Sequence, residues 1–475
     1  MLANLQGNIL KSHGRNSAVH LFLTFFDDSP AVKLWISDFT KRYVTSALRQ
    51  HQQSKASNDK SVSEKLFAGF YLSAAGYQSL GFEDLSEFVE DNSIENNVLI
   101  SFKDGMAAGF DELSDAPPDE WDEPFRDNRI HALVLLADDD DAQLSRTTEE
   151  IEASLENVAA GIFVQKGTVL RDANGKPIEH FGFRDCISQP LFYRQEIEKE
   201  REKGFDRWDS AAPLNLVLVE DVLSGAADAF GSYLVYRKLE QNVKAFKETE
   251  NRLAGAENLN LSEGDRERAG ALIVGRYRNG VPLELSGSAS VENLIDHNNF
   301  NFIGANDKPS VGKCPYHAHI RRMMPRGELG LKDGKFSDEE MRHRIVRRGI
   351  AYDDREKDKH GAPIVAGDAE TDVGLLFMCF QSSIPQQFGF LQARWANASG
   401  FLGVDEVGID PIIGQNRDLQ DFEHQKWYPK WGDDNEPSKS FEFKTFVTLK
   451  GGEYFFAPSI PFLESFSESK PEPQA

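Results

Sequence analysis

His131-Ala132-Leu133-Val134-Leu135-Leu136-Ala137-Asp138-Asp139-Asp140-Asp141 is the stretch that decides the predicted fold of this chain. Its first part is a continuous apolar run, typical of a buried strand, and its four aspartates can cap the start of a helix. Apolar residues then recur at roughly helical spacing from Leu144 to Val158, and Ile162–Leu170 has the pattern of a second strand. The stretch therefore predicts a strand–helix–strand unit. A calcium site is the alternative interpretation of the aspartates.

The segment before this unit has the same order of elements. Ala18–Phe26 is an apolar, β-prone run, and a helical pattern follows from Val32 to Val44. Leu66–Leu72 is aromatic-rich and strand-like, and Ala74–Leu80 can form a short helix. Two successive strand–helix–strand units predict a split β-α-β, ferredoxin-like domain.

The same pattern returns in the second half of the chain. It comprises two expected strands, each followed by an expected helix: Ser232–Arg237 with Leu239–Leu253, and Val373–Gln381 with Pro385–Asn397. Because 475 residues are too many for one hydrophobic core, we expect two domains. The prediction is an α+β fold of two ferredoxin-like domains with antiparallel sheets and peripheral helices, spanning residues 1–210 and 211–463. Residues 464–475 are rich in Ser, Glu and Pro, which predicts a disordered tail.

Composition excludes several classes of partner. A net charge of −24 argues against nucleic acid or an anionic membrane surface. Three widely separated cysteines without a C-x-x-C pair indicate neither a disulfide framework nor a zinc site. The N-terminus lacks the pattern of a signal peptide, and no apolar run approaches 18 residues. We therefore expect no membrane association and a cytoplasmic protein.

Cys314–Arg326 holds the first candidate for chemistry. Pro315 and Pro325 leave room for one short helix, on which His319 shares a face with Met323. A histidine on an apolar-flanked face with arginines beside it suits an axial ligand to haem iron. A core histidine next to a solvated arginine pair is the alternative.

Two further segments carry candidate polar groups. Gly182–Pro190 combines a flexible glycine, Asp185 and a proline exit, which suits a rigid loop that presents one carboxylate. Arg344–Tyr352 predicts a partly buried strand, on which Arg347 and Arg348 face opposite sides. One of the two arginines can then point into an apolar interior, where it needs a partner, while the other reaches solvent. An arginine pair at a sheet edge is the alternative interpretation.

Together these three pieces resemble the dye-decolourising peroxidases, in their large-chain branch. Gly182–Pro190 is similar to the family signature of Gly, two residues and Asp, Cys314–Arg326 to its proximal-histidine segment, and Arg347–Tyr352 to its distal-arginine strand. Other similar segments follow in the family's order: Leu5–Leu10, Gly374–Phe377, Trp395–Asn397, Asp410–Gln415 and Gly451–Ser459. The resemblance implies a fold of the dimeric α+β barrel type and one haem b per chain.

Residue by residue, the resemblance implies His319 as the iron ligand and Asp410 as the carboxylate that accepts its other ring proton. Asp185 would be the distal acid–base residue and Arg347 the distal arginine that stabilises charge as the O–O bond breaks. Leu375 would line the distal side.

The resemblance also bears on residues around this centre, among which Phe377 would line the distal side together with Leu375. Arg321 is a candidate contact for a haem propionate on its position alone. Tyr352 is a candidate for passing oxidising equivalents to substrates too large for the pocket, and a packed strand tyrosine is the alternative. Cys186 departs from the signature, which usually has Gly after the distal Asp. A positive φ there would strain Cys186.

The predicted function is a haem peroxidase that reduces hydrogen peroxide and oxidises bulky aromatic reductants, such as anthraquinone dyes, through a ferryl intermediate. We expect a monomer or a homodimer. One alternative is a non-enzymatic haem- or iron-handling protein, which would not need the pair Asp185 and Arg347. The other is a haem enzyme of the chlorite-dismutase kind, which does not require the distal carboxylate.

Overall fold

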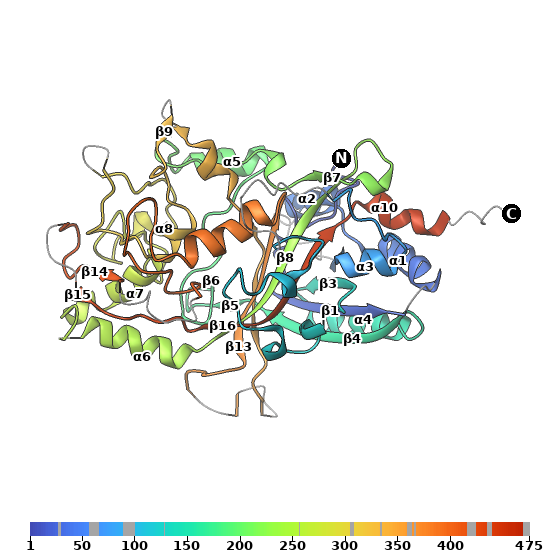
Figure 1. Ribbon diagram of the computed structural model, residues 1–475, viewed down its shortest axis with the longest axis horizontal. Coiled ribbons are helices and arrows are strands. Elements are labelled where there is room, and N and C mark those ends of the chain that lie inside the picture. The colour runs from blue at the N-terminus through green and yellow to red at the C-terminus, as the bar shows by residue number, and fades with distance from the viewer. Residues whose placement is uncertain are drawn as a thin grey trace.

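One antiparallel sheet, whose two halves have the same strand order and are called the first and second sheet below, forms the centre of the computed structural model (Figure 1). The structure describes residues 1–26, 30–56, 66–88, 100–127, 129–255, 257–304, 308–332, 335–358, 363–364, 367–415, 424–434 and 439–468. All structural statements below concern these residues.

The first sheet comes from the N-terminal part of the chain. Its strands are β1 (Ser17–Phe25), β2 (Phe67–Leu72), β3 (Ala132–Asp138) and β4 (Ala159–Thr168), in the order β4-β1-β3-β2. The helices are α1 (Pro30–Tyr43), α2 (Ala47–Ala56), α3 (Ala74–Ser79) and α4 (Asp141–Ser154). The Asp140 side chain caps α4, because its Oδ1 accepts hydrogen bonds from the amides of Ala142 and Gln143. The expected helix start at the aspartates is thus confirmed.

The second sheet repeats this arrangement. Its main strands are β8 (Phe230–Gln241), β12 (Ile350–Asp353), β13 (Val373–Gln381) and β16 (Val447–Ala457), in the order β12-β13-β8-β16. The short strand β11 (Val346–Arg347) pairs with β13, and β7 (Val219–Glu220) with β8. The helix α6 (Val243–Ala254) follows β8, and the π-helical segments η9 (Pro385–Gly389) and η10 (Leu391–Ala396) follow β13. Both halves are therefore ferredoxin-like, as predicted.

The two sheets share one core. β2 and β16 pair at Leu72 and Phe456, so the strands form one continuous sheet. At the other edges β4 approaches β12 closely: a Cβ on Gly167 would lie 2.6 Å from Cγ2 of Ile350. Rings from both halves also meet inside, as in the edge-to-face contact of Phe22 with the β8 ring of Tyr236 at 5.0 Å. The domain boundary at residue 210 stays a prediction.

Long connections of the second half surround α8 (His319–Met323) on the side of the molecule away from the first sheet (Figure 1). The remaining helices are α5 (Arg194–Arg201), α7 (Glu267–Val274), α9 (Asp338–Arg342) and α10 (Ile460–Ser465). The remaining two-residue strands are β5 (Leu170–Arg171), β6 (Pro177–Ile178), β9 (Leu331–Lys332), β10 (Lys335–Phe336), β14 (Lys426–Trp427) and β15 (Lys439–Ser440). These connections carry the residues of the candidate site.

The single-turn 3₁₀ segments complete the described elements: η1 (Met106–Gly109), η2 (Pro118–Glu120), η3 (Phe125–Asp127), η4 (Leu214–Leu216), η5 (Val222–Ser224), η6 (Glu263–Asp265), η7 (Glu292–Leu294) and η12 (Phe466–Glu468). Because α10 and η12 continue the helical chain to residue 468, the predicted disordered tail does not begin at residue 464. Residues 469–475 lie outside the described part.

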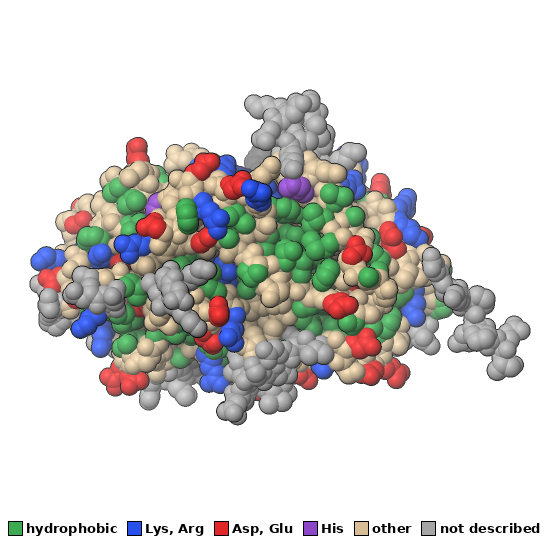
Figure 2. All heavy atoms as spheres, turned by 90° about the horizontal axis from the view of Figure 1, so that it is seen from above, with side chains coloured by type: hydrophobic (Ala, Val, Ile, Leu, Met, Phe, Trp, Pro, Cys, Tyr) green, Lys and Arg blue, Asp and Glu red, His purple; other side chains and the backbone are tan. Residues whose placement is uncertain are grey.

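Charge is dispersed over the one face of the molecule that Figure 2 presents. Figure 2 shows Asp and Glu side chains scattered among Lys and Arg on the face it presents, without a patch of one sign. No described helix is both long enough and apolar enough to cross a membrane.

Candidate active site

A cavity of about 300 Å³ lies between the loop that follows β6 and elements of the second half of the chain, and it is the centre of the candidate site. Its lining includes the loop that follows β6, strands β8, β11 and β13, helix α8, and the segments η9 and η10. Five sequence-predicted residues reach it together, namely Asp185, His319, Arg347, Leu375 and Phe377. A volume of this size is at the lower end of ordinary ligand pockets.

His319 begins α8 and is held by a buried carboxylate. Its Nδ1 lies 2.8 Å from Oδ2 of Asp410, whose side chain is fully buried. The other oxygen, Oδ1, accepts hydrogen bonds from the amides of Ile412 at 2.8 Å and Ile413 at 3.1 Å. Because Nδ1 is engaged, only Nε2 of His319 remains available as a ligand on the cavity side.

Asp185 is placed by the backbone around it. Its amide donates to the carbonyl of Pro177 at 3.1 Å, and its Oδ1 accepts the amide of Cys186 at 2.6 Å. Cys186 has a φ of +61°, so the strain foreseen for a cysteine at this position is present. Burial raises the pKa of the Cys186 thiol to about 12, and the Asp185 charge adds to the rise. The thiol is therefore protonated at neutral pH, which makes it a poor nucleophile.

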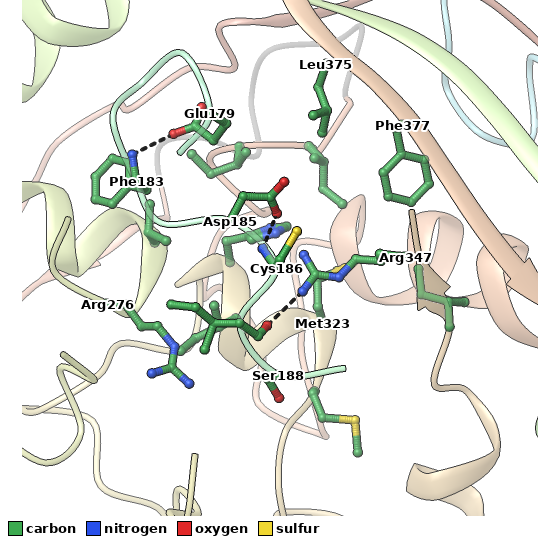
Figure 3. A pocket seen from close by; sticks show the side chains of 18 of the residues that line it. Glu179, Phe183, Asp185, Cys186, Ser188, Arg276, Met323, Arg347, Leu375 and Phe377 are labelled. Carbon is green, nitrogen blue, oxygen red and sulfur yellow. Dashed lines mark hydrogen bonds between the residues drawn. The ribbon is translucent and has the colours of Figure 1, made fainter. Parts of the chain in front are cut away.

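Arg347 lies on β11 near the same loop. Its Nη2 donates to the carbonyl of Ile187 at 3.0 Å, and its amide donates to the side chain of Gln189 at 3.0 Å. Figure 3 shows Asp185, Cys186 and Arg347 grouped at the centre of the cavity, and both charges act on the Cys186 thiol. An acid and a guanidinium thus occupy one wall of the cavity.

The neighbouring arginine departs from the expectation. Arg348 does face away from Arg347, but it is 7% exposed and does not reach solvent. Its guanidinium donates to the carbonyls of Asn8 at 2.6 Å and Ile9 at 3.0 Å. The Arg348 side chain therefore binds the N-terminal segment.

The apolar wall comes from β13. Leu375 and Phe377 lie two residues apart and so share one face of the strand, opposite Leu239 and Arg237 of β8. The ring of Phe388 lies 6.4 Å from that of Phe377. These side chains make this part of the cavity apolar.

Arg321 does not contact the cavity, contrary to the expectation. It is fully buried, and its guanidinium forms a bidentate ion pair with Glu328 at 2.6 and 2.8 Å. It also donates to the carbonyls of Ser310 and Cys314. Helix α8 is only five residues long. The position of Arg321 two residues after His319 therefore did not show whether its side chain faces the cavity.

Three other arginines line the cavity with polar but uncharged hydrogen-bond partners. Arg276 donates to two carbonyls and to Oδ1 of Asn298, Arg326 to two carbonyls and Ser188, and Arg344 to two carbonyls. Burial lowers the pKa of Arg276 and of Arg344 to about 10, and lowers that of Arg326. A buried cation without an anion is costly, so this set suits a ligand that carries carboxylates. The sequence contains no local signal for it, since the three come from separate connections.

Tyr352 is buried rather than on the surface. Its side chain is 2% exposed, and no described residue accepts a hydrogen bond from its hydroxyl. Nζ of Lys238 lies 5.0 Å from the ring centroid, which places a cation over the ring. This is the packed strand tyrosine of the alternative interpretation.

The donor set fits a haem. One histidine with a free Nε2, an apolar wall and three buried arginines are the groups that an iron porphyrin with two carboxylates requires. Two ferredoxin-like halves around such a cavity define a protein of the dimeric α+β barrel class.

Comparisons with known proteins agree with this class. The family model "DyP dimeric alpha+beta barrel domain" matches residues 4–170, and "Dyp-type peroxidase, C-terminal" matches residues 273–402. The multifunctional dye peroxidase DyP2 of Amycolatopsis sp. is 36% identical over 98% of this chain and 96% of its own length.

Solved structures are similar over the same extent. The DyP-type peroxidase AnaPX of Anabaena sp. is 41% identical, with a TM-score of 0.85 over 98% of this chain and 94% of its own. A dye-decolorizing peroxidase in complex with 2,6-dimethoxyphenol is 26% identical, with a TM-score of 0.75 over 98% of each chain. The chain belongs to the dye-decolourising peroxidase family and is a haem peroxidase of that type.

Proposed function

We propose that this chain binds one haem b through His319, reduces hydrogen peroxide with the help of Asp185 and Arg347, and oxidises bulky aromatic reductants. The observation that carries the proposal is that one cavity is lined by a carboxylate-bound histidine and by an acid and a guanidinium. A haem-handling protein would need the histidine alone, so the acid and the arginine favour the peroxidase. The chlorite-dismutase alternative needs no distal carboxylate, which Asp185 supplies here.

Each side chain has a defined task in this proposal. The hydrogen bond from Nδ1–H to Asp410 fixes the tautomer of His319 and makes Nε2 a more basic ligand. Asp185 accepts a proton from bound peroxide and returns it to the leaving oxygen. Arg347 stabilises the negative charge that develops as the O–O bond lengthens, an effect worth about 3–4 kcal/mol for one well-placed donor. His319 would hold the haem, which when bound would supply the redox chemistry of the reaction.

Arg276, Arg326 and Arg344 take the place of Arg321 as candidate contacts for the haem carboxylates. Their carbonyl partners position each guanidinium without neutralising it. Two carboxylates in this region would offset the electrostatic cost of burying these charges.

Relatives support the class of electron donor. One is named a multifunctional dye peroxidase, and another was solved with 2,6-dimethoxyphenol, a phenolic compound. The remaining proposals rest on the sequence alone: a domain boundary at residue 210, a monomer or homodimer, and a cytoplasmic location, which cell fractionation would test.

The test is the absorption spectrum of haem-loaded protein before and after one equivalent of hydrogen peroxide. We expect a histidine-ligated ferric spectrum that changes within seconds. Asp185→Asn and Arg347→Leu should each slow this change at least about 100-fold while haem still binds. A spectrum that is indifferent to peroxide would favour the haem-handling function. Failure to bind haem would refute the assignment of His319.

A further inference from the structure

Glu179 begins the tight turn that leads to the distal loop, and the turn is closed on itself. The amide of Glu179 donates to the carbonyl of Phe183 at 3.0 Å, and the amide of Gly182 donates to the carbonyl of Glu179 at 2.9 Å. Gly182 has a φ of +92°, which a residue with a side chain rarely adopts. The turn thus has one preferred geometry, two residues before Asp185.

The Glu179 side chain folds into this turn. Its Oε2 accepts the amide of Phe181 at 2.8 Å, and its Oε1 accepts the amide of Phe183 at 2.8 Å. A third donor, Nε2 of Gln241 on β8, lies 2.6 Å from Oε2. One carboxylate therefore ties two amides of the turn to the sheet, and Figure 3 shows its contact with Phe183.

This turn determines where Asp185 lies. Ile178 and Arg184 form an antiparallel bridge across it, and the Asp185 amide donates to the carbonyl of Pro177 at 3.1 Å. Glu179 and Asp185 line the same cavity. Any displacement of the Phe181–Phe183 backbone would therefore move the carboxylate of Asp185.

The charged groups around Glu179 leave its charge without a direct ion pair. Arg278 packs on the ring of Phe183 at 4.7 Å, but its guanidinium is bound by both oxygens of Glu250 at 2.6 and 2.9 Å. Arg184 is likewise paired with Asp296 at 2.6 Å.

The two cavity carboxylates consequently act on each other. Burial raises the pKa of Glu179, and the charge of Asp185 adds to the rise. Arg347, which contacts the carbonyl of Ile187, is the cation on the other side of Asp185.

We propose that Glu179 is a positioning residue for the peroxide reaction: the three hydrogen bonds that its carboxylate accepts fix the turn that carries Asp185, and so hold the Asp185 carboxylate where it accepts a proton. The inference deepens the proposed function and rests on it, because it assumes that Asp185 is the proton acceptor.

Two substitutions disturb the hydrogen bonds of the turn in different ways. Glu179→Gln removes the charge, and its amide must present NH₂ to one of the three donors. Glu179→Asp keeps the charge but is too short to reach both amides. A displacement on the order of 1 Å at a reacting group can cost about 100-fold in rate.

The measurements are the pH profile of the rate constant for the reaction with hydrogen peroxide and the pH dependence of fluoride affinity. Fluoride binding to ferric haem is accompanied by protonation of a distal group, so it reports that group without turnover. We expect Glu179→Gln to lower the rate constant at least about tenfold across the profile and to weaken fluoride binding, because one amide oxygen cannot accept from all three donors. Glu179→Asp should also lower the rate at least about tenfold.

Glu248→Gln is the matched control, since Glu248 is exposed on α6. Thermal unfolding of all variants shows whether they fold. If Glu179→Gln folds and reacts with hydrogen peroxide at the wild-type rate and with wild-type fluoride affinity, Glu179 does not position Asp185 and the inference is overturned. If Glu179→Gln does not fold, Glu179→Asp decides alone, and a wild-type rate would overturn the inference. A wild-type protein that does not react with peroxide refutes the proposed function instead.

Discussion

Replacing Asp410 by Asn should abolish tight haem binding by changing the tautomer of His319. In the wild type, Oδ1 of Asp410 accepts two amides, those of Ile412 and Ile413, and Oδ2 faces Nδ1 of His319. An asparagine has one carbonyl oxygen and one NH₂ group to place in these two positions. If NH₂ faced the amides, two buried donors would lose their acceptor, at a cost of about 1–3 kcal/mol each.

The oxygen of the introduced asparagine therefore stays with the amides, and its NH₂ points at His319. Nδ1 must then accept a hydrogen bond, which moves the ring proton to Nε2 and removes the lone pair that would bind iron. Loss of such a supporting partner typically costs 10–100-fold in metal affinity, or about 1.4–2.7 kcal/mol. The tautomer change places this substitution at the upper end of that range.

The assay is a titration of the haem-free protein with hemin, followed by absorbance. Asp405→Asn removes an exposed carboxylate five residues earlier and should bind hemin like the wild type. Asp410→Asn should bind at least about 30-fold more weakly, with a spectrum that lacks the histidine-ligated pattern. Wild-type affinity together with a histidine-ligated spectrum would refute this reasoning.

Three further substitutions test other features. Cys186→Gly should raise the free energy of unfolding by about 1 kcal/mol in a denaturant titration, because glycine tolerates a φ of +61°. Cys186→Ala should give no gain in the free energy of unfolding, because alanine keeps the side-chain carbon that strains this backbone. Tyr352→Phe should change turnover of a bulky dye less than about twofold, since the buried hydroxyl has no described acceptor and Lys238 disfavours oxidation of the ring. Glu453→Gln should be more stable than the wild type at pH 8, by about 2 kcal/mol, and this advantage should shrink toward pH 4.5. Burial raises the pKa of Glu453 to about 7, so the folded wild type holds a proton that the unfolded chain releases and loses stability as pH rises from 4.5 to 7.

Outcomes that contradict these expectations are equally specific. A gain for Cys186→Ala equal to that of Cys186→Gly would show that the thiol, not the backbone, is unfavourable. A large loss of dye turnover in Tyr352→Phe, with haem content and peroxide reaction intact, would restore its role in electron transfer. An unchanged difference between Glu453→Gln and the wild type across pH would show that this carboxyl does not titrate near 7.

The strands could be predicted from the sequence because their signal is local. Val373–Gln381 was expected as a strand and forms β13 with the same bounds. The helix expected from Leu239 begins only at Val243, because β8 continues to Gln241 between two neighbouring strands. Leu239 pairs there with both Leu375 and Leu449, and these tertiary contacts outweigh the helical spacing of the side chains.

The candidate site was predictable where a single short motif supplies the side chain. His319, Asp185 and Arg347 each lie in such a motif, and all three line the cavity. The partners of the arginines were not predictable, because they depend on how irregular connections fold. Arg326, with a φ of +47°, lies in such a connection, and it lines the cavity while Arg321 does not.

The pair Arg347 and Arg348 shows why the N-terminal segment matters for a site so far away in the sequence. Alternation along the strand places the two guanidiniums on opposite faces. Arg348 binds the carbonyls of Asn8 and Ile9, 340 and 339 residues away, and so fixes the strand against the N-terminal segment. With that side chain held, Arg347 can face only the cavity, where Ile187 accepts its hydrogen bond. The N-terminal residues therefore help to orient the distal arginine although they do not line the cavity themselves.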